Sequence, residues 1–303
     1  MQFLPFHRGE VAAQERAGFG GGVAPIRDFM PDQHRQFFGL LPMLPLATLD
    51  DAGAPVATIL AGPPGFIASP DRNSLLVDAR PDPSDPVAAH LRAGAALGLL
   101  GIDITTRRRN RANGVLRGVT AGMLDIAVTE SFGNCPQYIQ LREAVPLAAK
   151  PGLTLLPALD KAAEALLERA DTLFVASSGG AAGGVDMSHR GGRPGFVDYA
   201  EGRLTVPDFP GNRYFNTLGN FVEDPRAAVL VPDFGTGGVL HLAGRVEVLW
   251  DARGVVERAE RAWMLHVERA WRLEGALPQA WSLVEYSPTS LRSGVFFEGT
   301  KTV

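Results

Sequence analysis

The chain has 303 residues, enough for two ordinary domains or one large one, and its content of 46% hydrophobic and 20% charged residues is typical of globular proteins. Its formal net charge of −4 argues against a general nucleic-acid binder, and no apolar run approaches the roughly 20 residues that a membrane-spanning helix needs. We therefore expect neither a nucleic-acid partner nor a membrane. The N-terminus lacks the long apolar segment of a secretory signal, and one cysteine cannot form an intrachain disulfide, so we expect a cytoplasmic protein.

In chain order, the residue pattern first predicts two peripheral helices, at 8–17 and 32–40. A hairpin follows from 41 to slightly beyond 57, because two apolar runs flank an Asp-Asp-Ala-Gly turn. Short strands are predicted at 75–77, 97–104 and 115–119. A helix at 159–170 then precedes strands at 172–177, 203–206, 227–231 and 239–249. The segment 255–272 has apolar residues at helical spacing, and it predicts a last helix.

An internal repeat is the most informative feature of the sequence. The motif GPPGF at 62–66 returns as GRPGF at 192–196, an offset of 130, and the same offset carries the apolar run that ends in Asp103 onto the run that ends in Asp233. The triplet at 114–116 then corresponds to the triplet at 238–240, with a longer loop in the first copy. We therefore predict two copies of one mostly β domain, at 1–150 and 151–303.

Positive charge distinguishes the second copy from the first. At the offset of 130, Ser188, His189 and Arg190 correspond to Thr58, Ile59 and Leu60. Since the glycine-proline turn that follows is common to both copies, the turn is architectural, whereas the charge is not required by the fold. The pattern SHRGG therefore favours an anion held close to a glycine-rich backbone.

A second group of donors occurs only in the second copy. The segment 210–220 contains Asn212, Arg213, Asn216, Thr217 and Asn220, where the first copy has an acidic, proline-rich stretch. An arginine beside amide and hydroxyl donors at the start of a short helix suits a phosphate group. These donors point to a phosphate-bearing ligand.

These stretches carry a resemblance. The succession from DMSHRGGRPGFV through PGNRYFNTLGNFVEDPR to LHLAGRVEVL, within 172–250, is similar to the FMN-binding split-barrel domain of the pyridoxamine 5′-phosphate oxidase-related family. The resemblance implies a mainly β fold with peripheral helices, built as tandem six-stranded antiparallel split β-barrels. It implies noncovalent FMN at the interface between barrels, and a homodimer in addition to the internal pseudo-dimer. It also implies that Ser188, Arg190, Arg213, Asn216 and Thr217 bind the phosphate. Together with these five, the candidate cofactor-binding residues are His189, Gly191, Asp208, Asn212 and Asn220.

Several of these residues have a second interpretation. Arg190 and Arg213 could be solvated surface arginines, and Ser188 could cap the end of a strand. His189 fits a packed histidine better than a general base, because no nucleophile and carboxylate accompany it. The arginine-rich segment 107–113 is typical of an exposed hairpin, but with the loop at 133–138 it could form the second wall of a flavin pocket. Cys135 in that loop fits a buried small apolar residue.

We expect an FMN-dependent oxidoreductase that acts on a small molecule, with one FMN per chain and no metal site, and the sequence names no catalytic acid or base. The alternative is a flavin-binding, redox-sensing or stress-related protein without turnover, since fold alone does not determine function. A relative that handles haem or another cofactor is a third hypothesis.

Overall fold

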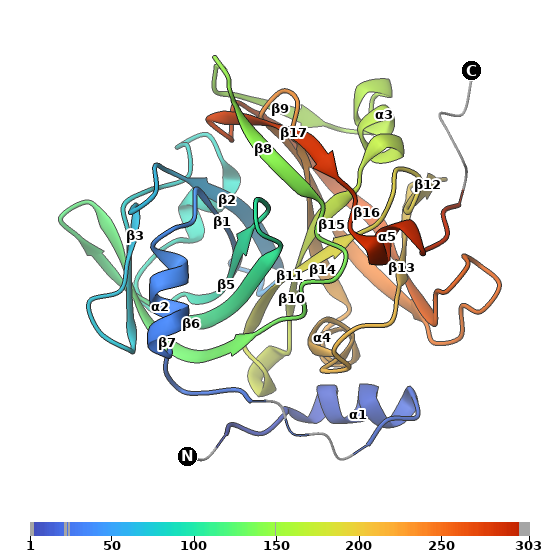
Figure 1. Ribbon diagram of the computed structural model, residues 1–303, viewed down its shortest axis with the longest axis horizontal. Coiled ribbons are helices and arrows are strands. Elements are labelled where there is room, and N and C mark those ends of the chain that lie inside the picture. Colours follow the sequence, from blue (N-terminus) through green and yellow to red (C-terminus); the bar gives the residue numbers. More distant parts are fainter. Residues whose placement is uncertain (1–2, 21–22, 24, 149, 297–303) are drawn as a thin grey trace.

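The computed structural model describes residues 3–20, 23, 25–148 and 150–296. Within that part, the chain is mainly β-structure in antiparallel sheets, with few helices (Figure 1). The helices are α1 (Arg8–Arg16), α2 (Asp32–Phe38), the 3-10 helices η1 (Pro86–His90) and η2 (Gly180–Ala182), α3 (Lys161–Arg169), α4 (Asn216–Glu223) and α5 (Pro288–Leu291). The helices predicted at 8–17, 32–40 and 159–170 are therefore present.

The first sheet contains seven strands in the order β2-β1-β5-β6-β7-β4-β3. Its strands are β1 (Met43–Leu49), β2 (Pro55–Ala61), β3 (Ile67–Ala68), β4 (Ser74–Val77), β5 (Ala96–Asp103), β6 (Arg108–Thr120) and β7 (Met123–Gly133). The predicted hairpin is β1 and β2, and Gly53 at φ +72° supplies the left-handed position in its turn.

The second sheet contains eight strands, of which seven follow the order β11-β10-β14-β15-β16-β13-β12 while β9 pairs with β16. Its strands are β9 (Gly152–Leu156), β10 (Thr172–Ser178), β11 (Val185–Gly191), β12 (Asp198–Ala200), β13 (Arg203–Asp208), β14 (Arg226–Asp233), β15 (Gly238–Leu249) and β16 (Arg261–Glu274). A separate two-stranded sheet pairs β8 (Leu141–Pro146) with β17 (Gln279–Glu285).

The two large sheets follow the same strand order, and each carries a β-bulge at the same place. The register shifts at Gly114 in β6 and at Gly244 in β15. A Cβ atom at Gly114 would lie 2.0 Å from the carbonyl oxygen of Ala127, and one at Gly244 would lie 1.9 Å from that of His266. Only glycine lets the neighbouring strand approach this closely, which makes the two glycines equivalent at an offset of 130.

This equivalence corrects the predicted loop. Asp103 pairs with Arg108 and Asp233 pairs with Gly238, so both turns contain four residues and the first copy has no longer loop. The arginine-rich segment is instead the beginning of strand β6, where Arg111 corresponds to His241. Charged residues resemble a loop in the sequence, but a strand tolerates them where it borders a polar cavity.

The helix predicted at 255–272 is wrong, because most of this segment is strand β16. Trp263, Leu265, Trp271 and Leu273 are buried and occupy alternate positions on either side of the bulge at Gly244. Trp263, Val267 and Trp271 recur every four residues, a spacing that fits one face of a helix as well as a strand. Pairing with β13 and β15 decides for the strand.

The sheets pack against each other where β1 and β2 of the first sheet meet β10 and β11 of the second, and an apolar core fills the space between them. Phe174, Ala176 and Met187 of the second sheet pack in one cluster with Ala47 and Ile59 of the first. Every residue of β10 is buried, as expected for a strand covered on both faces.

Helix α1 connects the N-terminal segment to the second sheet, because it packs against α4 (Figure 1). Two glycines allow this contact: a Cβ atom at Gly9 would lie 2.4 Å from the carbonyl oxygen of Gly219, and one at Gly219 would lie 2.6 Å from Cα of Glu10. The predicted division into 1–150 and 151–303 stays a prediction, with α1 and β8 making contacts across it.

We expect Gly244→Ala to lower the free energy of unfolding by about 1–3 kcal/mol, because the added methyl group must displace strand β16. Urea unfolding measures the change. Gly20→Ala is the matched control, since a Cβ atom there would meet nothing within 4 Å. Equal stability of the two variants would show that the bulge does not require glycine.

Candidate functional site

A cavity lies where the end of β11 meets the start of α4 and strand β6 of the first sheet. Nine of the ten residues predicted from the sequence line it. They are Ser188, His189, Arg190, Gly191, Asp208, Asn212, Arg213, Asn216 and Thr217. The first sheet contributes Arg109 and Arg111, and the loop that follows β7 contributes Asn134, Gln137 and Tyr138. The cavity therefore draws on both halves of the chain.

Asn220, the tenth predicted residue, lies behind the cavity wall. It is fully buried, and its amide nitrogen donates to Ser177 Oγ and Asp186 Oδ2, both at 2.9 Å. Its amide oxygen lies 3.0 Å from His7 Nε2. These contacts tie α4 to strands β10 and β11, so Asn220 positions the helix and does not reach the cavity.

Ser188 is held in the wall by Arg111 of the first sheet and Thr217 of helix α4. Its Oγ accepts a hydrogen bond from Arg111 Nη2 at 2.6 Å and another from Thr217 Oγ1 at 2.9 Å. The other arm of Arg111 donates to Asp186 Oδ1 at 2.9 Å, in an ion pair whose side chains are 4% and 5% exposed. Ser188 is therefore not a strand-end cap, because its hydroxyl belongs to a buried network within β11.

The N-terminus of α4 opens into the cavity without a side-chain cap. Phe215, the residue before the helix, has φ +61°, and Arg213 has φ +59°. Left-handed backbone at bulky residues is uncommon, and it concentrates at functional sites. The first N–H groups of a helix lack partners within the helix and carry partial positive charge. Asn216 and Thr217 in this first turn line the cavity.

Arginine side chains dominate the charge of the cavity. Five of its lining residues are arginines, and Asp208 is the one carboxylate among them. Arg261 Nε donates to Asp208 Oδ2 at 2.9 Å, and Arg190 lies 3.8 Å from the same carboxylate. Burial, and then the charge of Arg190, lower the pKa of Arg109 to about 10. Burial also lowers the pKa of Arg190. The protein thus concentrates cations in this cavity, although burial and the neighbouring positive charges disfavour their charged forms.

His189 is a neutral, buried side chain beside these cations. Its Nδ1 lies 3.0 Å from Arg109 Nη1, so this nitrogen accepts and Nε2 carries the proton. Burial, with the charges of Arg109 and Arg190, holds its pKa well below the ordinary value. Nε2 is buried and has no hydrogen-bond partner in the described ranges of the chain. It is a donor free for a ligand, which a merely packed histidine would not offer.

The loop after β7 forms the opposite wall. The backbone carbonyl of Cys135 accepts from Arg109 Nε at 2.6 Å, which fixes that arginine. The ring of Tyr138 stacks on Phe209 with centroids 5.6 Å apart, and its hydroxyl donates to the carbonyl of Pro210. Within the described residues, Asn134 Oδ1 and Gln137 Oε1 are buried without partners. Cys135 is only partly buried, so the expectation of a fully buried thiol is not met.

Sequence reasoning missed Arg261, Phe209 and Phe215, which also line the cavity. Arg261 fell in the segment predicted as a helix. Its guanidinium stacks on the ring of Phe215 at 4.9 Å while it binds Asp208. A weak sequence signal for the two aromatic residues existed, because Phe209 and Phe215 flank the segment around the motif PGNR, which the sequence analysis had selected.

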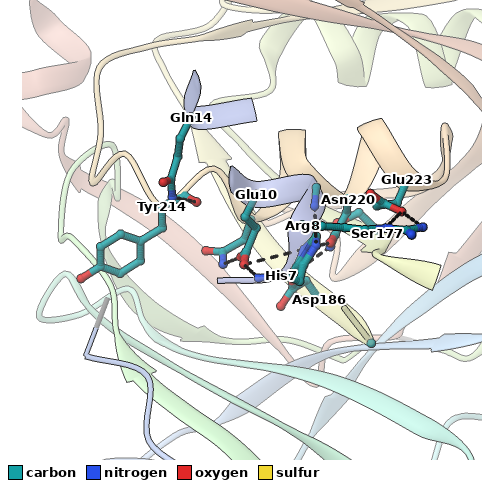
Figure 2. A network of polar contacts seen from close by, with 12 residues as sticks. His7, Arg8, Glu10, Gln14, Ser177, Asp186, Tyr214, Asn220 and Glu223 are labelled. Atoms are coloured by element: carbon teal, nitrogen blue, oxygen red, sulfur yellow. Dashed lines mark hydrogen bonds and ion pairs between the residues drawn. The ribbon is translucent and has the colours of Figure 1, made fainter. Parts of the chain in front are cut away.

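A buried polar network supports the cavity from the side of α1 (Figure 2). Glu10 accepts from the backbone nitrogen of His7 at 2.9 Å and from the side chain of Asn216, the first residue of α4. Arg8 forms an ion pair with Glu223 near the other end of α4. Burial, with the charge of Asp186, raises the pKa of Glu10 to about 8. Helix α1 is thus attached to α4 at both of its ends.

Comparisons with known proteins add only partial similarities. No protein-family model matches the chain, and no curated protein is similar to it in sequence. Three solved structures with similar regions are an FAD-binding protein of Mesorhizobium loti, a protein of Clostridium acetobutylicum related to general stress protein 26 of the pyridoxinephosphate oxidase family, and a putative 5-nitroimidazole antibiotic resistance protein of Bacteroides thetaiotaomicron.

Their TM-scores are 0.28, 0.29 and 0.28, with sequence identities of 13%, 13% and 12%. The similar region covers 40%, 40% and 43% of this chain and 97%, 90% and 93% of the respective relatives. Because each match has a TM-score below 0.5, none assigns a function or a ligand to the chain. None of the helices in the described residues has the length and apolar character needed to cross a membrane. Those residues also contain no group of three or more His, Cys, Asp or Glu side chains arranged for a metal ion.

The raised pKa of Glu10 predicts a specific pH dependence of stability. Between about pH 5 and pH 8 the unfolded chain releases this proton while the folded chain keeps it, so rising pH costs stability. In Glu10→Gln this contribution disappears, and the variant should lose less stability than the wild type over that range. Urea unfolding at several pH values measures it, with Glu15→Gln on the exposed face of α1 as control. Parallel curves for wild type and Glu10→Gln would contradict the assignment.

Proposed function

We propose that the protein binds FMN noncovalently in this cavity and uses it as an oxidoreductase on a small molecule. The observation that carries the proposal is an arginine-rich cavity at the uncapped N-terminus of α4, with stacked aromatic rings in its wall. A phosphate dianion needs several donors when it is buried. The aromatic side chains in the wall suit a planar ring. A site that binds a phosphate group alone would not require these side chains.

The residues present fit a phosphate group on the side of α4. Ser188 and Thr217 offer hydroxyl groups, and the first turn of α4 offers backbone N–H groups. Arg190 Nε is buried and has no partner among the described residues, so it adds a free donor. Arg213 is exposed at the mouth and stacks on the ring of Phe19 at 4.1 Å. These four side chains and the helix end would hold the phosphate.

The bound flavin would supply the redox chemistry by accepting and passing on a hydride or electrons. The protein's own residues bind and orient it: the arginines supply charge, and Tyr138 with Phe209 supplies a flat apolar wall. His189 is neutral and donates through Nε2, so it serves as a hydrogen-bond donor and not as a proton-accepting base. The alternative is a flavin-binding or redox-sensing protein without turnover. Reduction of the bound flavin by NAD(P)H or a substrate in steady state distinguishes the two.

We propose further that the chain is a tandem split barrel in which the first copy supplies the second wall of one pocket. The shared strand order of the two sheets supports a duplication. At the offset of 130, Arg111 is replaced by His241, Arg190 by Leu60, and Asn216 by Pro86. These replacements remove charge and donors from the equivalent place. The cytoplasmic location and a further homodimer stay predictions.

Arg190→Ala and Arg213→Ala should each weaken FMN binding about 10- to 150-fold, because each removes a charge-assisted hydrogen bond worth about 1.5–3 kcal/mol. Fluorescence titration of apoprotein with FMN measures the dissociation constant. Leu60→Met is the control, since Leu60 occupies the place equivalent to Arg190 and lies in the core of the first sheet. Unchanged affinity in both arginine variants would sink the phosphate assignment.

The same titration should give one equivalent of FMN per chain, since the first copy lacks the cradle. Extraction of the bound cofactor and mass spectrometry give an independent count. Two tight equivalents per chain would refute the single-site proposal.

A further inference from the structure

Four of the five cavity arginines already have an anionic partner or an assigned role. Arg111 pairs with Asp186, and Arg261 pairs with both Asp208 and Glu260. Arg190 and Arg213 are the two arginines assigned to the phosphate group. The fifth arginine is Arg109.

Among the residues that the structure describes, Arg109 is the cavity arginine that is neither assigned to the phosphate group nor paired with a carboxylate. Its recorded partners are the carbonyl of Cys135 and the neutral ring of His189, and no carboxylate bonds to it within the described part of the chain. Its remaining N–H groups are therefore available to a ligand.

Strand geometry separates Arg109 from the phosphate side. Alternate residues of a strand point to opposite faces, so Ser188 and Arg190 leave β11 on one side and His189 leaves it on the other. Ser188 meets Thr217 of α4, whereas His189 meets Arg109 and packs beside Phe174 in the core between the sheets. One phosphate group bound at α4 cannot also satisfy the side of His189.

We propose that Arg109 and Nε2 of His189 bind the carboxylate of a small aromatic acid, which is the substrate of the bound flavin. This inference rests on the proposed function. A carboxylate carries one negative charge, which matches the single positive charge of the Arg109 guanidinium, and it accepts from both donors. The stacked rings of Tyr138 and Phe209 favour an aromatic body. The buried, unpaired oxygens of Asn134 and Gln137, among the described residues, favour a hydroxyl or amino group on it.

The test uses FMN-loaded protein, with 4-hydroxybenzoate as the probe and the neutral 4-hydroxybenzamide as its isostere. Binding is followed by the flavin difference spectrum and by calorimetry. The wild type should bind the acid at least tenfold more tightly than the amide. Arg109→Gln should weaken acid binding by about 10- to 150-fold, which corresponds to loss of a charge-assisted hydrogen bond, while its FMN affinity stays within about twofold of the wild type.

Arg108→Gln is the matched control, because Arg108 neighbours Arg109 on β6 but is exposed and lies over the ring of Phe37. It should leave the affinities for both the acid and FMN unchanged. Equal binding of acid and amide, or full acid affinity in Arg109→Gln, would overturn the proposal. A large loss of FMN affinity in Arg109→Gln would overturn it too, because Arg109 would then belong to the cofactor site.

The two proposals fail separately. If the wild type takes up no FMN, the cofactor assignment is wrong, but calorimetry on the unloaded protein still compares acid with amide and wild type with Arg109→Gln. If the unloaded wild type prefers the acid and Arg109→Gln abolishes this preference, the proposed carboxylate site stands without the flavin.

Discussion

The buried ion pair between Arg111 and Asp186 is the interaction on which the site depends. It joins strand β6 of the first sheet to strand β11 of the second, with both side chains almost completely buried. Taking two charges out of water is expensive unless hydrogen bonds satisfy them. Ser188 accepts from the second arm of Arg111, and Asn113 and Asn220 donate to Asp186 at 2.8 and 2.9 Å. Each of these partners belongs to an element that borders the cavity, so the pair fixes their relative positions.

The same fold closes the equivalent place in the other half of the molecule. His241 stands where Arg111 would be, with its ring stacked on Trp271 at 4.8 Å, and burial lowers its pKa to about 3. Ile59 occupies the place of His189 and packs in the core between the sheets. Replacing an ion pair by a neutral ring and aliphatic side chains turns a polar cavity into ordinary core. One scaffold thus carries a site on one side and provides stability on the other.

Sequence reasoning worked where a local pattern has one structural meaning. The hairpin of β1 and β2 and the helices α1, α2 and α3 are examples. Nine of the ten candidate cofactor-binding residues line one cavity, and their binding of a cofactor stays a prediction. It failed where the meaning depends on a partner strand. The four-residue spacing of Trp263, Val267 and Trp271 in β16 fits a helix as well as a strand, and the arginines at the start of β6 resembled a loop. As a result, Arg109 was considered only as part of a hairpin, and Arg261 was not considered at all.

By itself, the sequence determined the mainly β class and the segments of the second half that carry unusual charge, because each of these is a pattern along the chain, and it indicated a repeat that stays a proposal. Only the tertiary structure decided which cations share a cavity. Arg109 and Arg111 are about 80 residues from Ser188 and His189 in sequence, and packing of β5 and β6 against β11 of the other sheet brings them together. The tertiary structure also separated Asn220 from the cavity and placed α1 against α4, since contacts between distant segments leave no periodic signal in the sequence.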